Sequence, residues 1–99
     1  MGLPITIDHE RVSEFCRRSR IRRLSFFGSV LRDDFGDQSD IDVLVEFEPE
    51  AIVGYLSMTR MEQELSDLSG RRVDMRTPDE LSSYFRDQVV AGAQAEYVA

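Results

Sequence analysis

The segment from Asp40 to Phe47 constrains the fold more than any other part of the sequence. Its odd-numbered positions are apolar and its even-numbered positions are mostly acidic, namely Ile41, Val43, Val45 and Phe47 against Asp40, Asp42, Leu44 and Glu46. Alternation with a period of two is typical of a β-strand that buries one face. The chain is therefore predicted to contain a sheet with one apolar face, and Asp40 and Asp42 are predicted to point to the opposite face.

Apolar spacing predicts further elements on both sides of this strand. Residues 8–20 and 52–68 repeat apolar side chains at helical spacing, and Thr77-Pro78-Asp79-Glu80 has the residues of a capping box that opens a third helix. Residues 24–27 and 72–76 are predicted strands, 30–35 is a predicted short helix, and the tail after Gly92 is open between helix and strand. This order predicts one α/β (or α+β) domain over residues 1–99, a small sheet with helices packed on it.

Asp40 and Asp42 form one half of a candidate ion site. Residues two apart on a strand have Cα atoms about 6.5–7 Å apart on one face, so the two carboxylates repel each other unless a cation or an Arg lies between them. Asp74 is the acidic centre of the strand 72–76, and it lies near this pair if the two strands are neighbours. Three carboxylates on rigid strands suit a hard cation such as Mg²⁺. Two such ions, about 3.5–4 Å apart, stabilise in-line phosphoryl displacement.

Gly28-Ser29 and Arg32 are predicted to form the other half, a phosphate-binding turn. A strand that ends on Gly lets a ligand approach the backbone, and Ser29 can cap the following helix, whose first N–H groups suit a triphosphate. Arg32 lies one turn later and can add charge-assisted hydrogen bonds. Each feature is common by itself. Their order along the chain, with Asp-x-Asp and a later inward acid after the turn, favours a metal-dependent phosphate site.

At these residues the sequence resembles the minimal nucleotidyltransferase (MNT) family of the DNA polymerase β-like superfamily. The family signature is Gly-Ser, a spacer that contains Arg, and Ser-Asp-x-Asp on the next strand. Here it reads Gly28-Ser29, Arg32 and Ser39-Asp40-Ile41-Asp42. Arg72-Val73-Asp74-Met75 matches the context of the family's third acid. One position departs from the pattern, because Asp33 stands where the family usually has Gly after the Arg.

The resemblance implies a polymerase β-like fold, a small mixed sheet flanked by helices, and a catalytic site on it. Asp40, Asp42 and Asp74 would be the catalytic metal ligands, and Gly28, Ser29, Arg32 and Ser39 would bind the nucleotide. The resemblance also implies two Mg²⁺ ions and ATP as co-substrate. Many members of the family are antitoxins whose partner is a HEPN-domain RNase toxin, and they transfer AMP from ATP to a tyrosine of that partner.

Two other functions stay open. The acid at position 33 and the Arg-only surface also fit an antitoxin that silences its partner by binding alone, with a vestigial metal site. A transferase for a small molecule such as an aminoglycoside is the third possibility. We expect it least, because the 99 residues show no second domain that would hold such an acceptor.

Composition limits the partners and the compartment. The formal net charge of −7 argues against nucleic acid or an anionic membrane as a direct ligand. All twelve basic residues are Arg, and the five between Arg17 and Arg23 fit either a solvated helix end that neutralises nearby acids or a rim that faces phosphate or the partner. Cys16 is alone, so no intrachain disulfide can form, and no apolar signal or membrane-length run is present, which predicts a cytoplasmic protein. Apolar helix faces in so small a domain leave a homo-oligomer open.

Overall fold

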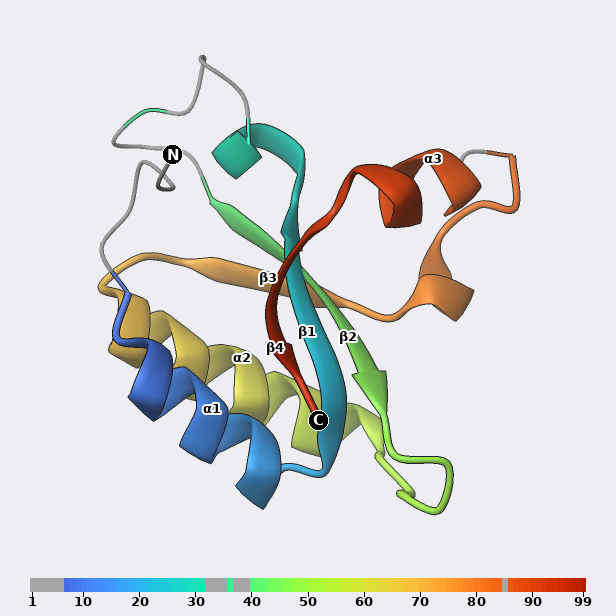
Figure 1. Ribbon diagram of the computed structural model, residues 1–99. Coiled ribbons are helices and arrows are strands. Elements are labelled where there is room, and N and C mark those ends of the chain that lie inside the picture. The colour runs from blue at the N-terminus through green and yellow to red at the C-terminus, as the bar shows by residue number, and fades with distance from the viewer. Residues whose placement is uncertain (1–6, 32–35, 37–39, 85) are drawn as a thin grey trace.

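The described residues form one mixed sheet of four strands, which confirms the small mixed sheet that was expected. We describe residues 7–31, 36, 40–84 and 86–99 of a computed structural model, and of Ser29 only the backbone. The strands are β1 (Ile21–Phe27), β2 (Ile41–Phe47), β3 (Val73–Arg76) and β4 (Gln94–Val98), in the order β3-β2-β1-β4. β1 runs antiparallel to both β2 and β4, whereas β2 and β3 are parallel. The parallel pair requires a crossover, which the helix between the two strands provides (Figure 1).

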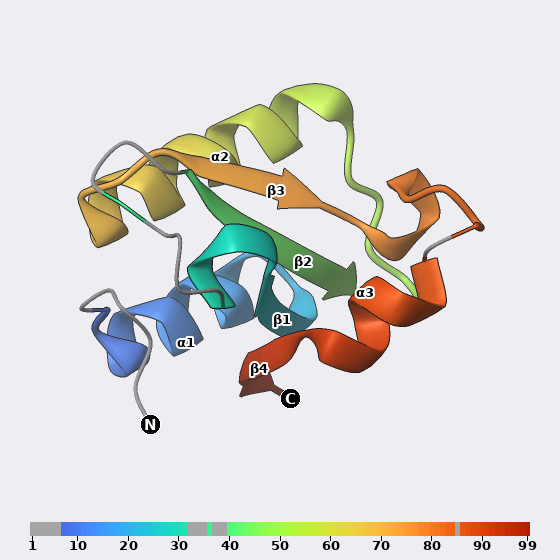
Figure 2. The ribbon, with the colours of Figure 1, turned by 90° about the horizontal axis from the view of Figure 1, so that it is seen from above.

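Two helices, α1 (His9–Arg18) and α2 (Tyr55–Ser69), cover one side of this sheet, and the short α3 (Arg86–Gly92) lies on the other (Figure 2). The core lies between the sheet and the helix pair. Each large apolar side chain buried there contributes about 1.5–3 kcal/mol to the free energy of unfolding. The buried core residues are Val12, Phe15, Cys16, Ile21, Leu24, Phe26, Val30, Ile41, Val43, Val45, Leu65, Val73 and Met75.

Local sequence signals explain where the two long helices begin and end. Asp8 caps α1, because its carboxylate accepts from the backbone N–H groups of Glu10 and Arg11. α2 begins at Tyr55, three residues later than predicted, since Gly54 before it is extended and Ile52 is fully exposed. Gly70 ends α2 in the left-handed conformation, at φ 71°.

The prediction of one continuous helix that begins at Thr77 is wrong. The Glu80 carboxylate accepts from the Thr77 N–H at 3.1 Å, as a capping box requires, but only a 3₁₀ turn, Pro78–Glu80, follows. The chain then becomes extended at Leu81, and the Ser82 hydroxyl accepts from the Tyr84 N–H at 3.2 Å. Such a local side-chain bond competes with the helical ladder, which is why the α-helix begins only at Arg86.

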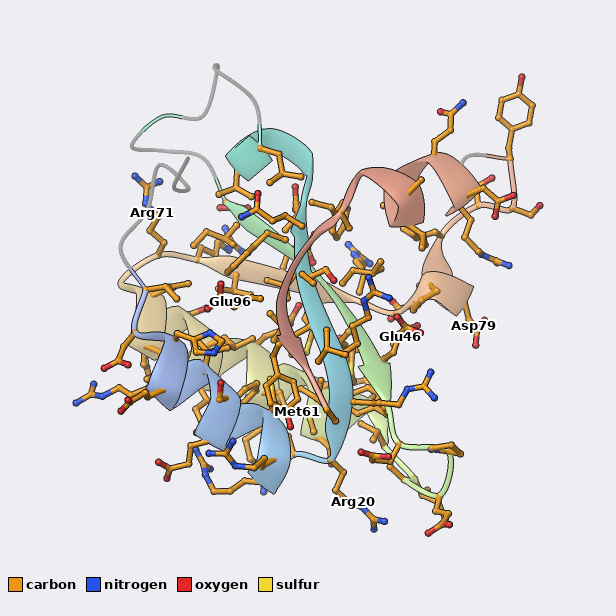
Figure 3. The ribbon with its side chains drawn as sticks, in the orientation of Figure 1. Arg20, Glu46, Met61, Arg71, Asp79 and Glu96 are labelled. Carbon is orange, nitrogen blue, oxygen red and sulfur yellow. The ribbon has the colours of Figure 1, made fainter. Side chains whose placement is uncertain are left out.

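The C-terminal tail, which the sequence left open, forms strand β4 beside β1. Glu96 on β4 points toward α1 (Figure 3), and its Oε2 lies 2.7 Å from His9 Nδ1. Tyr97 packs against the core. The tail therefore adds an edge strand to the sheet and links it to the N-terminal helix. No helix in the part of the chain described here is long and apolar enough to cross a membrane.

Candidate functional site

Two of the three predicted acids meet on neighbouring strands. Asp42 on β2 is the direct register partner of Asp74 on β3. Their neighbours in sequence, Ile41, Val43 and Val73, are buried in the core, so both carboxylates point to the opposite face of the sheet. Adjacent strands lie about 4.7–4.9 Å apart. The two acids therefore form a pair whose mutual repulsion would be relieved by a cation.

Gly28 brings the turn after β1 directly against Asp42. Phe27 pairs with Asp42 across the sheet, and Gly28 follows with φ +76°, in the left-handed region that favours glycine. A Cβ atom at position 28 would lie 3.2 Å from Asp42 Cγ and closer still to its Oδ2. Only glycine leaves room for this carboxylate, which means that the turn and the acid share one site, as the sequence motif predicts.

The segment after Gly28 is described only in part. A short helix was expected over residues 30–35; the structure has a 3₁₀ turn at Gly28–Leu31, and residues 32–35 of the predicted helix lie outside the described residues. Arg32, Asp33 and Ser39 lie outside the described residues, and only the backbone of Ser29 is described. Gly36, in the spacer, accepts a 2.8 Å hydrogen bond from the guanidinium of Arg71, which points to this segment (Figure 3). The roles of Ser29, Arg32 and Ser39 in nucleotide binding stay predictions.

Asp40 lies just before β2 and is exposed. It lines a cleft of about 320 Å³ together with Glu62, Arg72, Val73 and Asp74. The cleft joins the start of β2 to the free side of β3, so that the first and third predicted acids border one space. Asp40 and Asp74 therefore border a common cleft. Asp42 is close to both, because it follows Asp40 by two residues and is the register partner of Asp74.

Arg76, among the described residues, places a positive charge next to Asp74. Its guanidinium is 3.3 Å from the Asp74 carboxylate and 3.7 Å from that of Glu80. The pKa of Arg76 is raised above its ordinary value, first by the charge of Asp74 and then by the hydrogen bond between them. Asp74 thus has a local counter-charge in this structure, and a ligand with a stronger positive charge would compete with Arg76 for it.

The chemistry of these donors fits a divalent cation that a nucleotide completes. Within residues 7–31, 36, 40–84 and 86–99, no three His, Cys, Asp or Glu side chains are close enough together to hold an ion by themselves. Mg²⁺ is usually held by one or two carboxylates, with phosphate oxygens and waters as the other ligands. The Asp42–Asp74 pair, two carboxylates in direct register on neighbouring strands, meets that requirement.

Sequence reasoning missed Glu62 and Arg76 as residues of this region. Glu62 Oε2 accepts from the Met75 N–H at 2.7 Å, and the hydroxyl of Ser66 accepts from the Val73 N–H at 3.0 Å. These are the backbone donors on the free side of β3, which is an edge strand. The only sequence signal that α2 binds the edge of β3 was the i, i+4 spacing of Glu62 and Ser66. This spacing is informative only once β3 is known to lie beside α2.

The arginine cluster between Arg17 and Arg23 lies away from these acids. Arg23 pairs with Glu46 near the far end of β1, four residues from Phe27, or on the order of 13 Å along the strand. Arg22 is 3.5 Å from Glu46, and Arg18 is 2.5 Å from Glu64. Arg18 and Arg22 thus neutralise nearby acids, and the described arginines of the cluster do not line the cleft beside Asp40 and Asp74.

Known proteins resemble this chain in sequence and in fold. Residues 10–95 match the sequence family described as the nucleotidyltransferase domain. The protein adenylyltransferase MntA of Thermococcus cleftensis is 36% identical over 70 residues, which are 71% of this chain and 69% of that protein. A solved structure assigned as a minimal nucleotidyltransferase is 35% identical, with a TM-score of 0.71, over 86% of this chain and 85% of its own.

A further solved structure shares the fold at 18% identity. It is the tri-AMPylated HEPN toxin of Shewanella oneidensis in complex with its MNT antitoxin, and the match has a TM-score of 0.66 over 92% of this chain and 70% of that one. A likeness at this identity concerns the arrangement of helices and strands, here the mixed sheet flanked by helices.

Proposed function

Because the chain belongs to the nucleotidyltransferase domain family, we propose that it transfers AMP from ATP to a tyrosine hydroxyl of a partner HEPN toxin and so acts as an antitoxin. One observation carries the chemistry. Gly28 leaves room for the Asp42 carboxylate, and Asp74 lies in register beside it, so a phosphate-binding turn and two acids share one site. The relative named protein adenylyltransferase and the fold shared with an antitoxin of an AMPylated HEPN toxin support the choice of donor, acceptor and partner.

In this mechanism the described residues position the reacting groups. Asp42 and Asp74, with Asp40 at the border of the cleft, would hold Mg²⁺, which when bound neutralises charge on the triphosphate and on the displaced phosphate oxygens. The turn at Gly28 places the β- and γ-phosphates against the end of β1. The acceptor oxygen attacks the α-phosphorus, the bond to the β-phosphate oxygen breaks, and pyrophosphate leaves. Asp74 accepts the proton of the acceptor hydroxyl directly or through a water.

The test is label transfer from α-phosphate-labelled ATP with Mg²⁺ in lysate from the native host. We expect one small protein to be labelled by the wild type and not by Asp42→Asn, and we expect EDTA to abolish labelling. Asp87→Asn, which removes the same charge from the exposed first turn of α3, is the matched control and should label as the wild type does. Label transfer by Asp42→Asn at the wild-type rate would overturn the site assignment.

The other outcomes separate the alternative functions. If the wild type and Asp42→Asn co-purify with the same protein and neither labels it, the chain is an antitoxin that acts by binding alone. Labelling of free hydroxyl compounds without any protein acceptor would instead identify a transferase for small molecules. Either result overturns the proposed AMP transfer to a protein.

A further inference from the structure

A groove runs along the free edge of β3, between the first half of α2 and the 3₁₀ turn that follows the strand. Its volume is about 350 Å³. Figure 2 shows α2 and β3 side by side, with the turn at Pro78–Glu80 beyond the end of the strand. The α2 wall consists of Tyr55, Met58, Thr59 and Glu62, which are spaced at i, i+3, i+4 and i+7 and so lie on one face of the helix. We call this space the α2–β3 groove.

The groove is continuous with the candidate catalytic site. Asp74 and Glu62 line both the groove and the cleft that holds Asp40. A side chain that lies in the groove with its tip at Asp74 would therefore reach the residue that accepts the proton in the proposed reaction. The groove thus leads from the surface of α2 to the reacting centre, which is the path that a macromolecular acceptor needs.

The start of α2, beside the groove, is apolar and exposed. Tyr55 is 84% exposed, and it is followed by Leu56, which is 77% exposed. Met58, deeper in the groove, is partly buried against the core. Exposed aromatic and Met side chains are enriched where proteins bind partners, and an aromatic side chain buries 150–250 Å² when it docks. An aromatic acceptor residue, such as tyrosine, fits this wall.

The backbone edge of β3 is closed to an added strand. The two outward N–H groups of the strand, those of Val73 and Met75, are already bound by Ser66 and Glu62 of α2. An incoming chain cannot form the main-chain ladder that strand addition requires. Recognition in the groove must therefore use side chains, with their size and charge as the determinants.

The charge of the groove defines those side chains. Among the described residues that line the groove, Glu62, Asp74 and Glu80 contribute three carboxylates, and Arg76, which is paired with Asp74 and Glu80, contributes one cation. The formal charge of these described lining residues is thus −2. Because unlike charges attract at short range and like charges repel, a segment with basic residues beside its tyrosine would bind here in preference to an acidic one.

We propose that the α2–β3 groove binds the acceptor segment of the partner protein, a tyrosine flanked by basic residues, with the hydroxyl at Asp74. This inference rests on the proposed function and specifies which surface selects the acceptor. It gives Tyr55 and Thr59 a role in binding the acceptor, and it assigns the exposed apolar start of α2 to the partner interface.

The test uses two synthetic peptides, one with a single tyrosine between two arginines and one with a single tyrosine between two glutamates. AMP transfer from labelled ATP is measured for the wild type, for Thr59→Arg in the groove and for Ser57→Arg on the exposed opposite side of α2, a matched control that adds the same charge to the same helix. Circular dichroism checks folding, and binding of Mg²⁺-ATP is measured for each variant.

We expect the wild type to prefer the basic peptide at least ten-fold in kcat/KM. Thr59→Arg should raise KM for this peptide about ten-fold or more, Ser57→Arg should change it less than two-fold, and binding of Mg²⁺-ATP should be unchanged in both. If the wild type labels both peptides equally and Thr59→Arg has no more effect than Ser57→Arg, the groove inference fails while the transferase function stands. If the wild type labels neither peptide nor any lysate protein, the proposed function fails and the groove inference with it.

Discussion

Replacement of Gly28 by Ala separates the chemistry of the site from the stability of the fold. The backbone at this position has φ +76°, where a side chain costs about 1–2 kcal/mol because Cβ approaches the following carbonyl oxygen. The new Cβ would also lie 3.2 Å from Asp42 Cγ and nearer to Oδ2, so the carboxylate must rotate away. Rotation of this half-buried carboxylate removes a predicted metal ligand from its position.

Gly70→Ala is the matched control. Gly70 has φ +71°, nearly the same backbone conformation, and a Cβ there would meet nothing within 4 Å. Both variants should lose about 1–2 kcal/mol, which for a domain of this size lowers Tm by about 5–15 °C. Only Gly28→Ala should lose AMP transfer, by about a hundred-fold or more, because a misplacement of about 1 Å in a reacting group has effects of that size.

The assays are thermal unfolding followed by circular dichroism and label transfer from α-labelled ATP below the Tm of both variants. Full transfer activity in Gly28→Ala would refute the reasoning, because it would mean that the Asp42 carboxylate does not need the space that glycine leaves. An equal loss of transfer in Gly70→Ala would refute it as well, since the effect would then follow from backbone strain alone.

Three further predictions follow from the described contacts. Glu62→Ala removes the acceptor for the part-buried Met75 N–H and should lower the free energy of unfolding by about 1–3 kcal/mol in urea titrations, unlike Gln63→Ala on the exposed side of α2. Burial raises the pKa of the Cys16 thiol from its ordinary 9.0 to about 12. The folded state therefore favours the protonated thiol, so its contribution to stability is complete below pH 9 and is lost as the pH rises toward 12, and iodoacetamide should alkylate Cys16 only after unfolding. Arg23→Ser should leave the KM for ATP unchanged, because Arg23 lies at the far end of β1 from Gly28; a several-fold rise would place the arginine cluster in the nucleotide site.

Alternation and local motifs were enough to predict much of this protein. The period of two over Ile41–Phe47 identified the central strand and the face that carries Asp42, because side chains alternate along any strand whatever its neighbours are. The helical spacing of Met58, Met61 and Leu65 likewise placed α2 against the core. Signals of this kind are local, and the sequence contains them in full.

Leu44 and the helix predicted from Thr77 are two features that local sequence patterns did not predict correctly. Leu44 was expected on the mostly acidic face, yet it is buried beside Ser25 of β1, so that second face is covered there as well. The capping box at Thr77 opens only a 3₁₀ turn, because the Ser82 hydroxyl binds the backbone a few residues later. A motif fixes how a helix can start, but competing bonds along the next turn decide whether it continues.

The candidate site depends both on the sequence and on the tertiary structure. The sequence by itself supplied its residue types, a glycine at the end of a strand and acids on two later strands. Only the tertiary structure decided that β3 lies parallel to β2 with Asp74 directly across from Asp42, that Gly28 abuts Asp42, and that Glu62 and Arg76 complete the surroundings. The physical reason is that the period of a strand specifies which face a side chain occupies, whereas strand order and register depend on contacts between segments about thirty residues apart, which no local pattern contains.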